Sequence, residues 1–348
     1  MRQVWVTRAG PPETLQVREA PDPVPGPGQV RLRVAAAGVN FADVMMRLGI
    51  YPDAPPLPAV PGYEAAGVID AVGEGVPAAR VGERVVAFCR FGGYADRLCV
   101  ACEAVFPVPA GVPLTIAAAL PVNYLTAWQM LVVMAGVKAG DIVLVHGAAG
   151  GVGLAAVDLC RRAGARVFGS ASPAKHAALA ERGVEFCVDS RRRDFAAAVR
   201  AAAGGRGVDL VLEPRHGAWI RESYAALAPT GRLVLFGFSS AAPGKTPSRL
   251  AVLRTLAGVP WLALNPIRLM NDNRGVMGVN LGRLWGEGER VRGWMTELVR
   301  LLAEGDVSPH VDRVYPFTEA AAAHHWLQDR RNVGKVLLAP DGAREAVS

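Results

Sequence analysis

The sequence predicts an α/β protein in which a doubly wound parallel sheet of six strands is joined to a mostly β domain. Two observations indicate the sheet: short apolar runs alternate with alanine-rich segments from residue 141 onward, and a glycine-rich turn follows the first run. A third observation indicates the β domain, because residues 1–122 are rich in Pro, Gly and short alternating runs. A chain of 348 residues is long enough for both domains.

Six apolar runs predict the strands of the sheet. Each run is nearly continuous in apolar residues, which is typical of parallel strands covered on both faces. Helical segments between them imply right-handed crossovers and a doubly wound arrangement. The expected strands are 142–146, 166–169, 185–188, 208–213, 232–237 and 276–281, and the expected helices are 153–163, 174–182, 194–203 and 218–227.

The two flanks of this region differ from it. Alternating runs at 29–35 and 84–88 predict short strands in the first flank. The last flank, 286–348, opens with an amphipathic helix and closes with the strand-like run 334–338. We expect this tail to return to the first domain. The apolar face of its helix carries Val291, Trp294, Met295, Leu298, Leu301 and Leu302.

The glycine-rich turn is the most specific local motif. A strand ending at His146 runs into Gly147-Ala148-Ala149-Gly150-Gly151-Val152-Gly153, where a helix is expected to start. This context is typical of a dinucleotide-binding loop, whose glycines admit a pyrophosphate to the positive end of the helix. The alternative is a tight turn without a ligand. The expected contacts are Ala149, Gly150, Gly151 and Val152, and Gly153 is expected to let the helix pack closely.

The end of the second strand favours NADPH over NADH. An NAD site usually has an Asp or Glu there for the ribose 2′-hydroxyl. Here the next acid is Glu181, whereas Ser172 and Lys175 offer a hydroxyl and an ammonium that suit a 2′-phosphate. Ser172 could instead cap a helix, with Lys175 in solvent, and both roles are compatible.

Composition and charge argue against nucleic-acid-binding, secreted and membrane-spanning proteins. The net charge is +7, but the basic residues are scattered and the densest run is residues 191–193, so we expect no nucleic-acid binding. The N-terminus lacks the apolar core of a signal peptide, and no run approaches the ~20 apolar residues of a spanning helix. With five cysteines and no secretion signal, we expect reduced thiols, a cytoplasmic location and no stable membrane insertion.

Several short stretches together resemble the medium-chain dehydrogenase/reductase superfamily. They are residues 37–43 (AGVNFAD), 49–52 (GIYP), 60–67 (VPGYEAAG), 124–127 (YLTA), the glycine loop and 334–336 (GKV). In order along the chain they resemble the zinc-independent quinone oxidoreductase branch, and 265–270 (NPIRLM) with 276–280 (VMGVN) resembles the vesicle amine transport protein-like members. The resemblance implies a GroES-like catalytic domain, 1–122 with 286–348, around a Rossmann domain, 123–285.

The resemblance also implies that no metal takes part. Metal-dependent members of the superfamily have a Cys where this chain has Asn40 and a His where it has Tyr63. Amide and phenol groups are poor zinc ligands, and Glu64 alone cannot hold the ion. The sequence also lacks the four-cysteine structural zinc lobe. Its single C-x-x-C pattern, Cys99 and Cys102, is interpreted as two core thiols.

Site residues follow from the same resemblance. Asn40 and Asp43 are expected at the nicotinamide end, Tyr51 as hydroxyl donor to a carbonyl, and Tyr63 as a second donor or as packing in the vacated metal site. Asn40 could instead tie a turn and Tyr51 could act as a lid. The further cofactor contacts implied are Asn40, Thr126, Phe236, Gly237, Phe238 and Asn332. The run Glu213-Pro214-Arg215-His216 departs from the family's usual Asp and Gly pair, with a possible effect on cofactor contacts.

Three functions fit these features. The first is an NADPH-dependent reductase that passes hydride to a small quinone or α,β-unsaturated carbonyl. The second is an enoyl reductase for acyl thioesters, and the third is a non-catalytic NADPH-binding, lipid-handling protein. The apolar stretch in residues 246–270 supports the third, although a helix at the interface of a homodimer explains it equally.

Overall fold

The computed structural model describes residues 1–237, 244–246, 248, 250, 253 and 265–342. The chain forms two compact units. The first comprises Met1–Leu125, Lys245–Pro247 and Trp285–Ser348, and the second comprises Thr126–Gly244 and Ser248–Leu284. The boundary at Leu125 falls inside one helix, α3 (Pro121–Trp128). In the part of the chain that is described, no helix combines the length and the apolar character needed to cross a membrane.

The first unit is built on a mixed, mainly antiparallel sheet of seven strands. Its order is β14-β15-β3-β4-β5-β7, with β6 paired to β3, and a separate hairpin joins β1 to β2. The predicted strands at 29–35 and 84–88 appear as β3 and β5. The strands are β1 (Arg2–Val6), β2 (Leu15–Glu19), β3 (Gln29–Val39), β4 (Glu64–Val72), β5 (Arg84–Phe88), β6 (Arg97–Ala101), β7 (Val105–Pro107), β14 (Val311–Pro316) and β15 (Lys335–Ala339).

The tail of the chain returns to this sheet, as predicted. β15 pairs antiparallel with β3, so that Val336 lies opposite Val39, and it pairs parallel with β14. The long tail helix α10 (Gly288–Glu304) buries its apolar face except for the half-buried Trp294. The other helical elements are α1 (Phe41–Arg47), α2 (Leu114–Ala118), α11 (Ala320–Gln328), η1 (Pro12–Thr14), η2 (Ala78–Arg80), η3 (Cys102–Ala104) and η9 (Phe317–Glu319).

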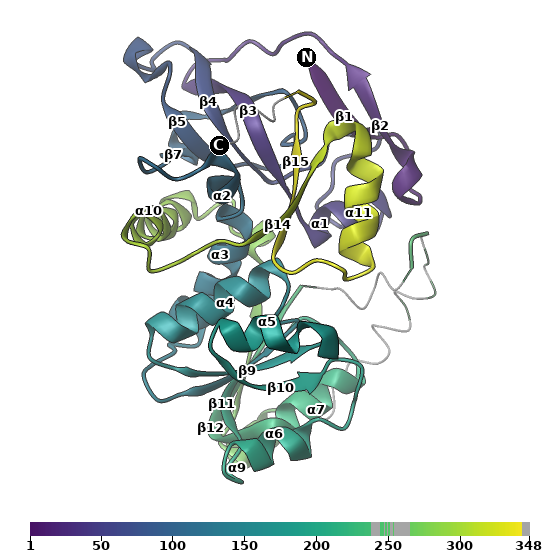
Figure 1. The fold of residues 1–348 in the computed structure, drawn as a ribbon, viewed down its shortest axis with the longest axis vertical. Coiled ribbons are helices and arrows are strands. Elements are labelled where there is room, and N and C mark those ends of the chain that lie inside the picture. Colours follow the sequence, from purple (N-terminus) through teal and green to yellow (C-terminus); the bar gives the residue numbers. More distant parts are fainter. Residues whose placement is uncertain (238–243, 247, 249, 251–252, 254–264, 343–348) are drawn as a thin grey trace. The chain divides into compact units, whose positions relative to one another are not determined.

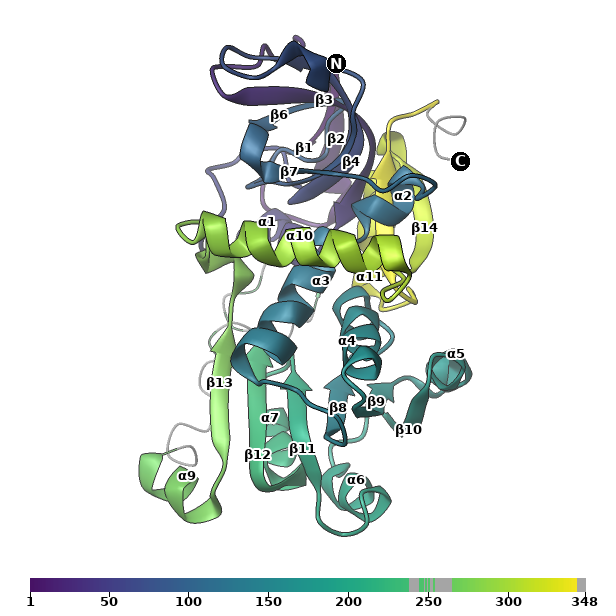
Figure 2. The ribbon, with the colours of Figure 1, turned by 90° about the vertical axis from the view of Figure 1, so that its left-hand side faces the viewer.

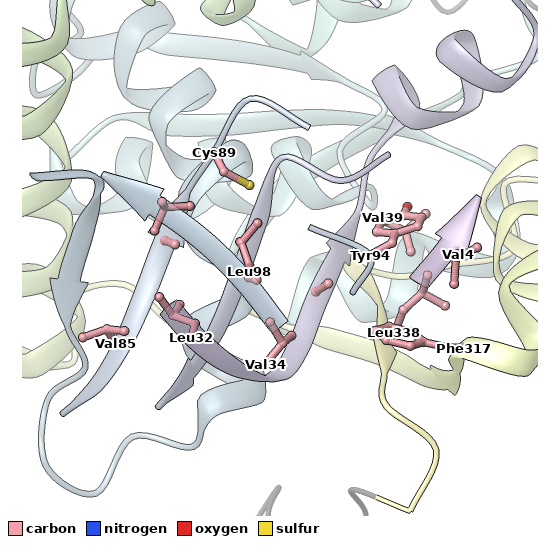
Figure 3. Close-up of a cluster of buried hydrophobic side chains, with 14 of the residues drawn as sticks. Val4, Leu32, Val34, Val39, Val85, Cys89, Tyr94, Leu98, Phe317 and Leu338 are labelled. Carbon is pink, nitrogen blue, oxygen red and sulfur yellow. The ribbon is translucent and has the colours of Figure 1, made fainter. Parts of the chain in front are cut away.

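The core of the first unit joins its two ends. Side chains from β1, β3, β4, β5 and β6 pack with others from β15, η9 and α11. Figure 3 shows Phe317 and Leu338 from the tail beside Val4, and Val39 beside Tyr94. Burial of this apolar surface is the main stabilising term, so the tail is part of the unit rather than an appendage.

The second unit is a doubly wound parallel sheet in the order β10-β9-β8-β11-β12-β13. Figure 1 shows α4 and α5 on one side of the sheet and α6, α7 and α9 on the other. Figure 2 shows the six strands side by side, with β13 at one edge. The strands are β8 (Ile142–His146), β9 (Arg166–Ala171), β10 (Val184–Asp189), β11 (Val208–Glu213), β12 (Leu227–Phe236) and β13 (Gly275–Val279).

All the strands and helices predicted for this sheet are present, with boundaries shifted by a few residues. The largest shift concerns Leu227, which was expected to end a helix and instead begins β12 in extended conformation. The helices are α4 (Gly151–Arg162), α5 (His176–Glu181), α6 (Ala196–Ala202), α7 (Ala218–Ala226) and α9 (Pro266–Asp272), with η4, a π-helical turn (Gln129–Met134), η5 (Pro173–Lys175) and η8 (Leu281–Arg283).

Candidate functional site

The glycine loop connects β8 to α4 in the second unit. Gly147 has a φ of +66°, a conformation that favours glycine, and Gly150 is the N-cap residue of α4. A Cβ on Gly153 would lie 2.3 Å from the carbonyl oxygen of Gly147, so only glycine lets the helix start this close to the loop. The N–H groups at the start of α4 therefore form a site suited to a pyrophosphate, with Ala149 and Val152 on either side of the glycine pair.

The end of β9 carries the two residues predicted to recognise a 2′-phosphate. Ser172 is the N-cap residue of η5, but its hydroxyl makes no capping hydrogen bond, and Lys175 ends the same turn. The carbonyl of Ala171 accepts a hydrogen bond from the N–H of Ser190 at 2.9 Å, which brings the loop after β10 against this end of β9. That loop continues into the three arginines 191–193, of which Arg191 pairs with Asp189 and Arg192 with Asp194.

A buried polar network at the ends of β8 and β11 was not predicted from the sequence. Arg215 donates to Oε1 of Glu213 through Nε at 2.8 Å and to Nδ1 of His146 through Nη2 at 2.7 Å. Because a guanidinium has no acceptor, Nδ1 must be the unprotonated nitrogen, and Nε2 then donates to Ser223 at 3.2 Å. Ser223 in turn donates to Oε2 of Glu213 at 2.6 Å, which closes the ring of hydrogen bonds.

This network explains the departure from the family pattern at residues 213–216. The guanidinium of Arg215 stacks 3.7 Å from the ring centroid of Trp219 and donates to the carbonyl of Ser190. It is buried rather than turned to solvent, so it ties the loop after β10 to the end of β11. Burial lowers the pKa of His146 to about 4, which keeps its ring neutral and able to accept from Arg215.

The other described residues of the predicted cofactor site lie on α3, at the end of β12 and in the segment before β15. Thr126 is on α3, Phe236 is the last residue of β12, and Gly237 follows it, exposed, with a φ of +65°. Phe238 lies outside the described residues. In the first unit, Asn332 is buried before β15, and its side-chain amide donates to the carbonyl of Gly334 at 2.7 Å.

In the first unit, Asn40 and Asp43 fix the start of α1. Asn40 is the N-cap residue, and its N–H donates to Oδ2 of Asp43 at 2.8 Å. Oδ1 of Asp43 accepts from the N–H of Gly62 at 2.9 Å, next to Tyr63. The carboxyl of Asp43 therefore anchors two backbone segments, to which Asn40 contributes its backbone N–H, while the side chain of Asn40 contacts Glu64 and Lys335.

Asp43 also belongs to a chain of buried polar groups. The hydroxyl of Tyr94 donates to Oδ2 of Asp43 at 3.0 Å and lies 3.4 Å from Nε2 of His324. Burial raises the pKa of Asp43 to about 7 and lowers that of His324 to about 3. His324 is thus buried, whereas the adjacent His325 reaches the surface and pairs with Glu13 at 2.6 Å.

Three aromatic rings lie together beside these groups. Tyr63 packs edge-on against Tyr51, with ring centroids 6.2 Å apart, and lies 4.9 Å from Phe91. Tyr63 is buried and Tyr51 is partly exposed. Burial strongly raises the pKa of the Tyr63 hydroxyl, so it stays protonated and can act only as a neutral donor or acceptor.

The position of the superfamily's metal does not fit zinc in this chain. Oε1 of Glu64 accepts from Nδ2 of Asn40 at 2.9 Å and forms an ion pair with Lys335, while Oε2 accepts from the N–H of Val122 at 2.7 Å. Both carboxylate oxygens are therefore engaged. Among the described residues, no cluster of three His, Cys, Asp or Glu side chains has the arrangement of a metal site.

A mainly antiparallel β unit built from both ends of the chain, together with a doubly wound parallel unit, is typical of two-domain nucleotide-dependent dehydrogenases and reductases. Two family profiles agree: "Alcohol dehydrogenase GroES-like domain" matches residues 26–110, and "Zinc-binding dehydrogenase" matches residues 182–338. The human synaptic vesicle membrane protein VAT-1 homolog is 41% identical over 334 residues, which cover 95% of this chain and 84% of that protein.

Two solved structures are similar over nearly the whole chain. Mycobacterial Rv1454c, in complex with NADPH, is 33% identical with a TM-score of 0.84, and the match covers 98% of this chain and 100% of that one. The CurK enoyl reductase is 30% identical with a TM-score of 0.82, covering 97% and 99%. The chain belongs to the medium-chain dehydrogenase/reductase superfamily of oxidoreductases, and VAT-1 homologs are among its close relatives.

Proposed function

We propose that this protein is an NADPH-dependent, zinc-independent reductase that transfers hydride to a quinone or an α,β-unsaturated carbonyl. The observation that carries the proposal is that both carboxylate oxygens of Glu64 already have partners. One pairs with Lys335 and the other accepts from the N–H of Val122, beside Asn40 and Tyr63. Without a Lewis acid to stabilise an alkoxide, oxidation of a simple alcohol is difficult. A quinone or enone delocalises the charge that develops, so a site with these side chains suffices.

The cofactor part of the proposal rests on the second unit. The N–H groups of residues 149–152 would hold the pyrophosphate, and Ser172 and Lys175 the 2′-phosphate. A solved relative with NADPH bound, 33% identical over 98% of this chain, supports the same choice. When bound, NADPH supplies the hydride. Thr126, Phe236, Gly237 and, in the first unit, Asn332 are proposed to contact the ribose and nicotinamide.

The substrate part of the proposal rests on the first unit. Tyr51 is the more exposed of the two paired tyrosines and is proposed to donate a hydrogen bond to the carbonyl oxygen. Tyr63 is proposed to pack against the Tyr51 ring as a protonated phenol. Asn40 and Asp43 hold the backbone around this pair, and Asn40 is proposed at the nicotinamide end.

A second candidate is an enoyl reductase for acyl thioesters. The likeness to the CurK enoyl reductase favours it, because that protein shares 30% identity over 97% of this chain. Thioester-linked enones accept hydride at the same carbon as free enones, so the side chains described above serve both. The third candidate, a lipid-handling protein that binds NADPH without turnover, is suggested by the names of the vesicle-membrane relatives.

The homodimer and the cytoplasmic location are also proposals. β13 forms one edge of the six-stranded sheet, and Val132, Val133 and Met134 on η4 expose apolar surface in the same unit. β13 and η4 are in contact with each other, so these residues flank that edge. All five cysteines are unpaired, as suits a reducing compartment.

The experiment is a substrate panel with the purified full-length chain. Loss of NADPH absorbance is followed with 1,4-benzoquinone, 9,10-phenanthrenequinone, several free enones and a crotonyl thioester. Turnover of the quinones or free enones supports the proposal, and turnover of the thioester alone supports the second candidate. Tight NADPH binding with co-sedimentation on lipid vesicles and no turnover would reject both enzymes. Near-stoichiometric zinc in protein purified without a metal-affinity column, with loss of activity on chelation, would reject zinc independence.

A further inference from the structure

Lys335 is a buried lysine at the start of β15. Its side chain is 2% exposed and that of Glu64 is fully buried. The ammonium forms an ion pair with Oε1 of Glu64 and donates to Oδ1 of Asn40 at 2.6 Å. A buried ammonium without such partners would be strongly unfavourable, so its charge is held in place by these two side chains.

Glu64 is fitted into this position by the surrounding backbone. A Cβ on Gly38 would lie 2.1 Å from Oε1 of Glu64, so only glycine on β3 leaves room for the carboxylate. The other oxygen, Oε2, accepts from the N–H of Val122 at the start of α3. Three strands (β3, β4 and β15) and the starts of two helices (α1 and α3) therefore meet at one ion pair.

In the Glu64–Lys335 pair one carboxylate faces one ammonium, so these two charges balance each other. The neighbouring carboxyl of Asp43 is fully buried, and burial raises its pKa to about 7, although the charge of Lys335 acts in the opposite direction. A divalent cation added here would leave an excess positive charge in a site removed from water, at a large cost in free energy.

Asn40 has its orientation fixed by the same pair. Its Oδ1 accepts from Lys335 and its Nδ2 donates to Glu64, so a flipped carboxamide would place a donor against the ammonium and an acceptor against the carboxylate. Asn40 stands where metal-dependent members have a cysteine ligand. The ion pair thus fixes a side chain that stands where metal-dependent members have a ligand.

We propose that Lys335 is a positioning residue whose ammonium takes the place of the metal cation, pairing with Glu64 and holding the Asn40 carboxamide in one orientation. Its effect on turnover rests on the proposed reductase function, whereas its effect on the charge balance does not. No bond to substrate is formed by Lys335. It acts through Asn40 and through the two helix starts.

A double-mutant cycle on the full-length chain tests the proposal. Lys335→Met alone leaves a buried, unpaired carboxylate, and Glu64→Gln alone leaves a buried, unpaired ammonium. The double variant Glu64→Gln/Lys335→Met has neither charge. We expect the two single substitutions to be non-additive by about tenfold or more in the equilibrium constant of unfolding, measured in urea.

Steady-state kinetics distinguish positioning from a structural role. In Glu64→Gln/Lys335→Met we expect kcat with the best acceptor to fall about tenfold or more, while KM for NADPH stays within about twofold. Lys245→Met is the matched control, because Lys245 also forms an ion pair, with Asp329 at 2.8 Å, but on the surface. This control is expected to leave both the stability and kcat unchanged.

Each outcome decides between the two roles. Additive single substitutions, or a double variant with the kcat of the wild type, would overturn the proposal. If Lys335→Met and the double variant both fail to fold, a folded Lys335→Arg protein supports a requirement for charge, and an unfolded one overturns it. A wild type without reductase activity would reject the proposed function, while the unfolding cycle would still test the ion pair.

Discussion

The hydroxyl oxygen of Tyr94 lies 3.4 Å from Nε2 of His324, and both side chains are fully buried. Burial lowers the pKa of His324 to about 3, and the charge of Arg47 acts in the same direction. The folded protein therefore keeps this imidazole neutral, whereas the unfolded chain protonates it near pH 6.5. The stability that the neutral ring contributes is complete above pH 6.5 and is lost as the pH falls toward 3.

We predict that His324→Gln weakens this pH dependence. Between pH 6.5 and 4, the free energy of unfolding of the wild type should fall more steeply than that of the variant, by at most about 1.4 kcal/mol per pH unit. The raised pKa of Asp43 has the opposite sign, because the folded state holds a proton there between about pH 4 and 7. Asp43 is present in both proteins, so the difference in slope reports His324. Urea unfolding at several pH values measures it, and equal slopes would contradict the buried, neutral ring.

The preference for NADPH is predicted to depend on Lys175. Loss of a charge-assisted hydrogen bond in Lys175→Ala should cost about 1.5–3 kcal/mol, or roughly 10- to 150-fold in the dissociation constant for NADPH. NADH lacks the 2′-phosphate, so its affinity should change by less than about threefold. Higher salt should weaken NADPH more than NADH.

A second variant and a control accompany this measurement. Ser172→Ala should cost less, about 1 kcal/mol, since its hydroxyl makes no capping hydrogen bond and its loss should affect NADPH alone. Lys138→Ala removes an exposed lysine of the same unit and should change neither affinity. A wild type that binds both cofactors equally, or an unchanged ratio in Lys175→Ala, would show that the missing acid does not decide the cofactor.

Gly150→Asp is predicted to block cofactor binding in a folded protein. Gly150 has φ and ψ of −81° and 174°, which any residue adopts, and it is the N-cap residue of α4, where Asp is favourable. A Cβ would lie 3.3 Å from the carbonyl oxygen of Gly147, a tight but tolerable contact. The carboxylate would, however, repel a pyrophosphate. Gly150→Ser, without the charge, should bind NADPH more tightly than Gly150→Asp, and unchanged affinity in the folded Asp variant would mean that the loop is only a turn.

The parallel sheet could be predicted from the sequence because its signals are local. The apolar runs at 142–146 and 208–213 coincide with β8 and β11, since buried parallel strands are apolar on both faces and end at polar residues. The glycine loop could be predicted equally well, because its glycines and the strand and helix that flank them are close together in the sequence. Leu227 shows the limit of such signals: it is as compatible with the end of a helix as with the start of a strand.

The ion pair and the network around Arg215 could not be predicted in this way. Glu64 and Lys335 are far apart in the sequence, and their contact depends on the register of β3 against β4 and β15. Lys335 gave one usable signal, a single charge at the start of a fully buried strand. Arg215 was recognised as a departure from the family pattern, but its direction, inward toward Glu213 and His146, follows from tertiary packing.

The proposed homodimer leads to a prediction about Val133. Its side chain is 41% exposed on η4, in contact with the edge strand β13 through the same helical turn. If a second copy covers this edge, Val133→Glu would bury a carboxylate without a partner, which costs several kcal/mol and should raise the dissociation constant of the dimer by about 100-fold or more. Val314→Glu is a matched control, because Val314 is also an apolar residue with 41% exposure but lies on β14 in the first unit. Sedimentation velocity over a range of concentrations should show monomer for Val133→Glu and dimer for both the wild type and Val314→Glu. A monomeric wild type would remove the basis of the prediction, and a dimer dissociated by Val314→Glu but not by Val133→Glu would move the interface away from β13.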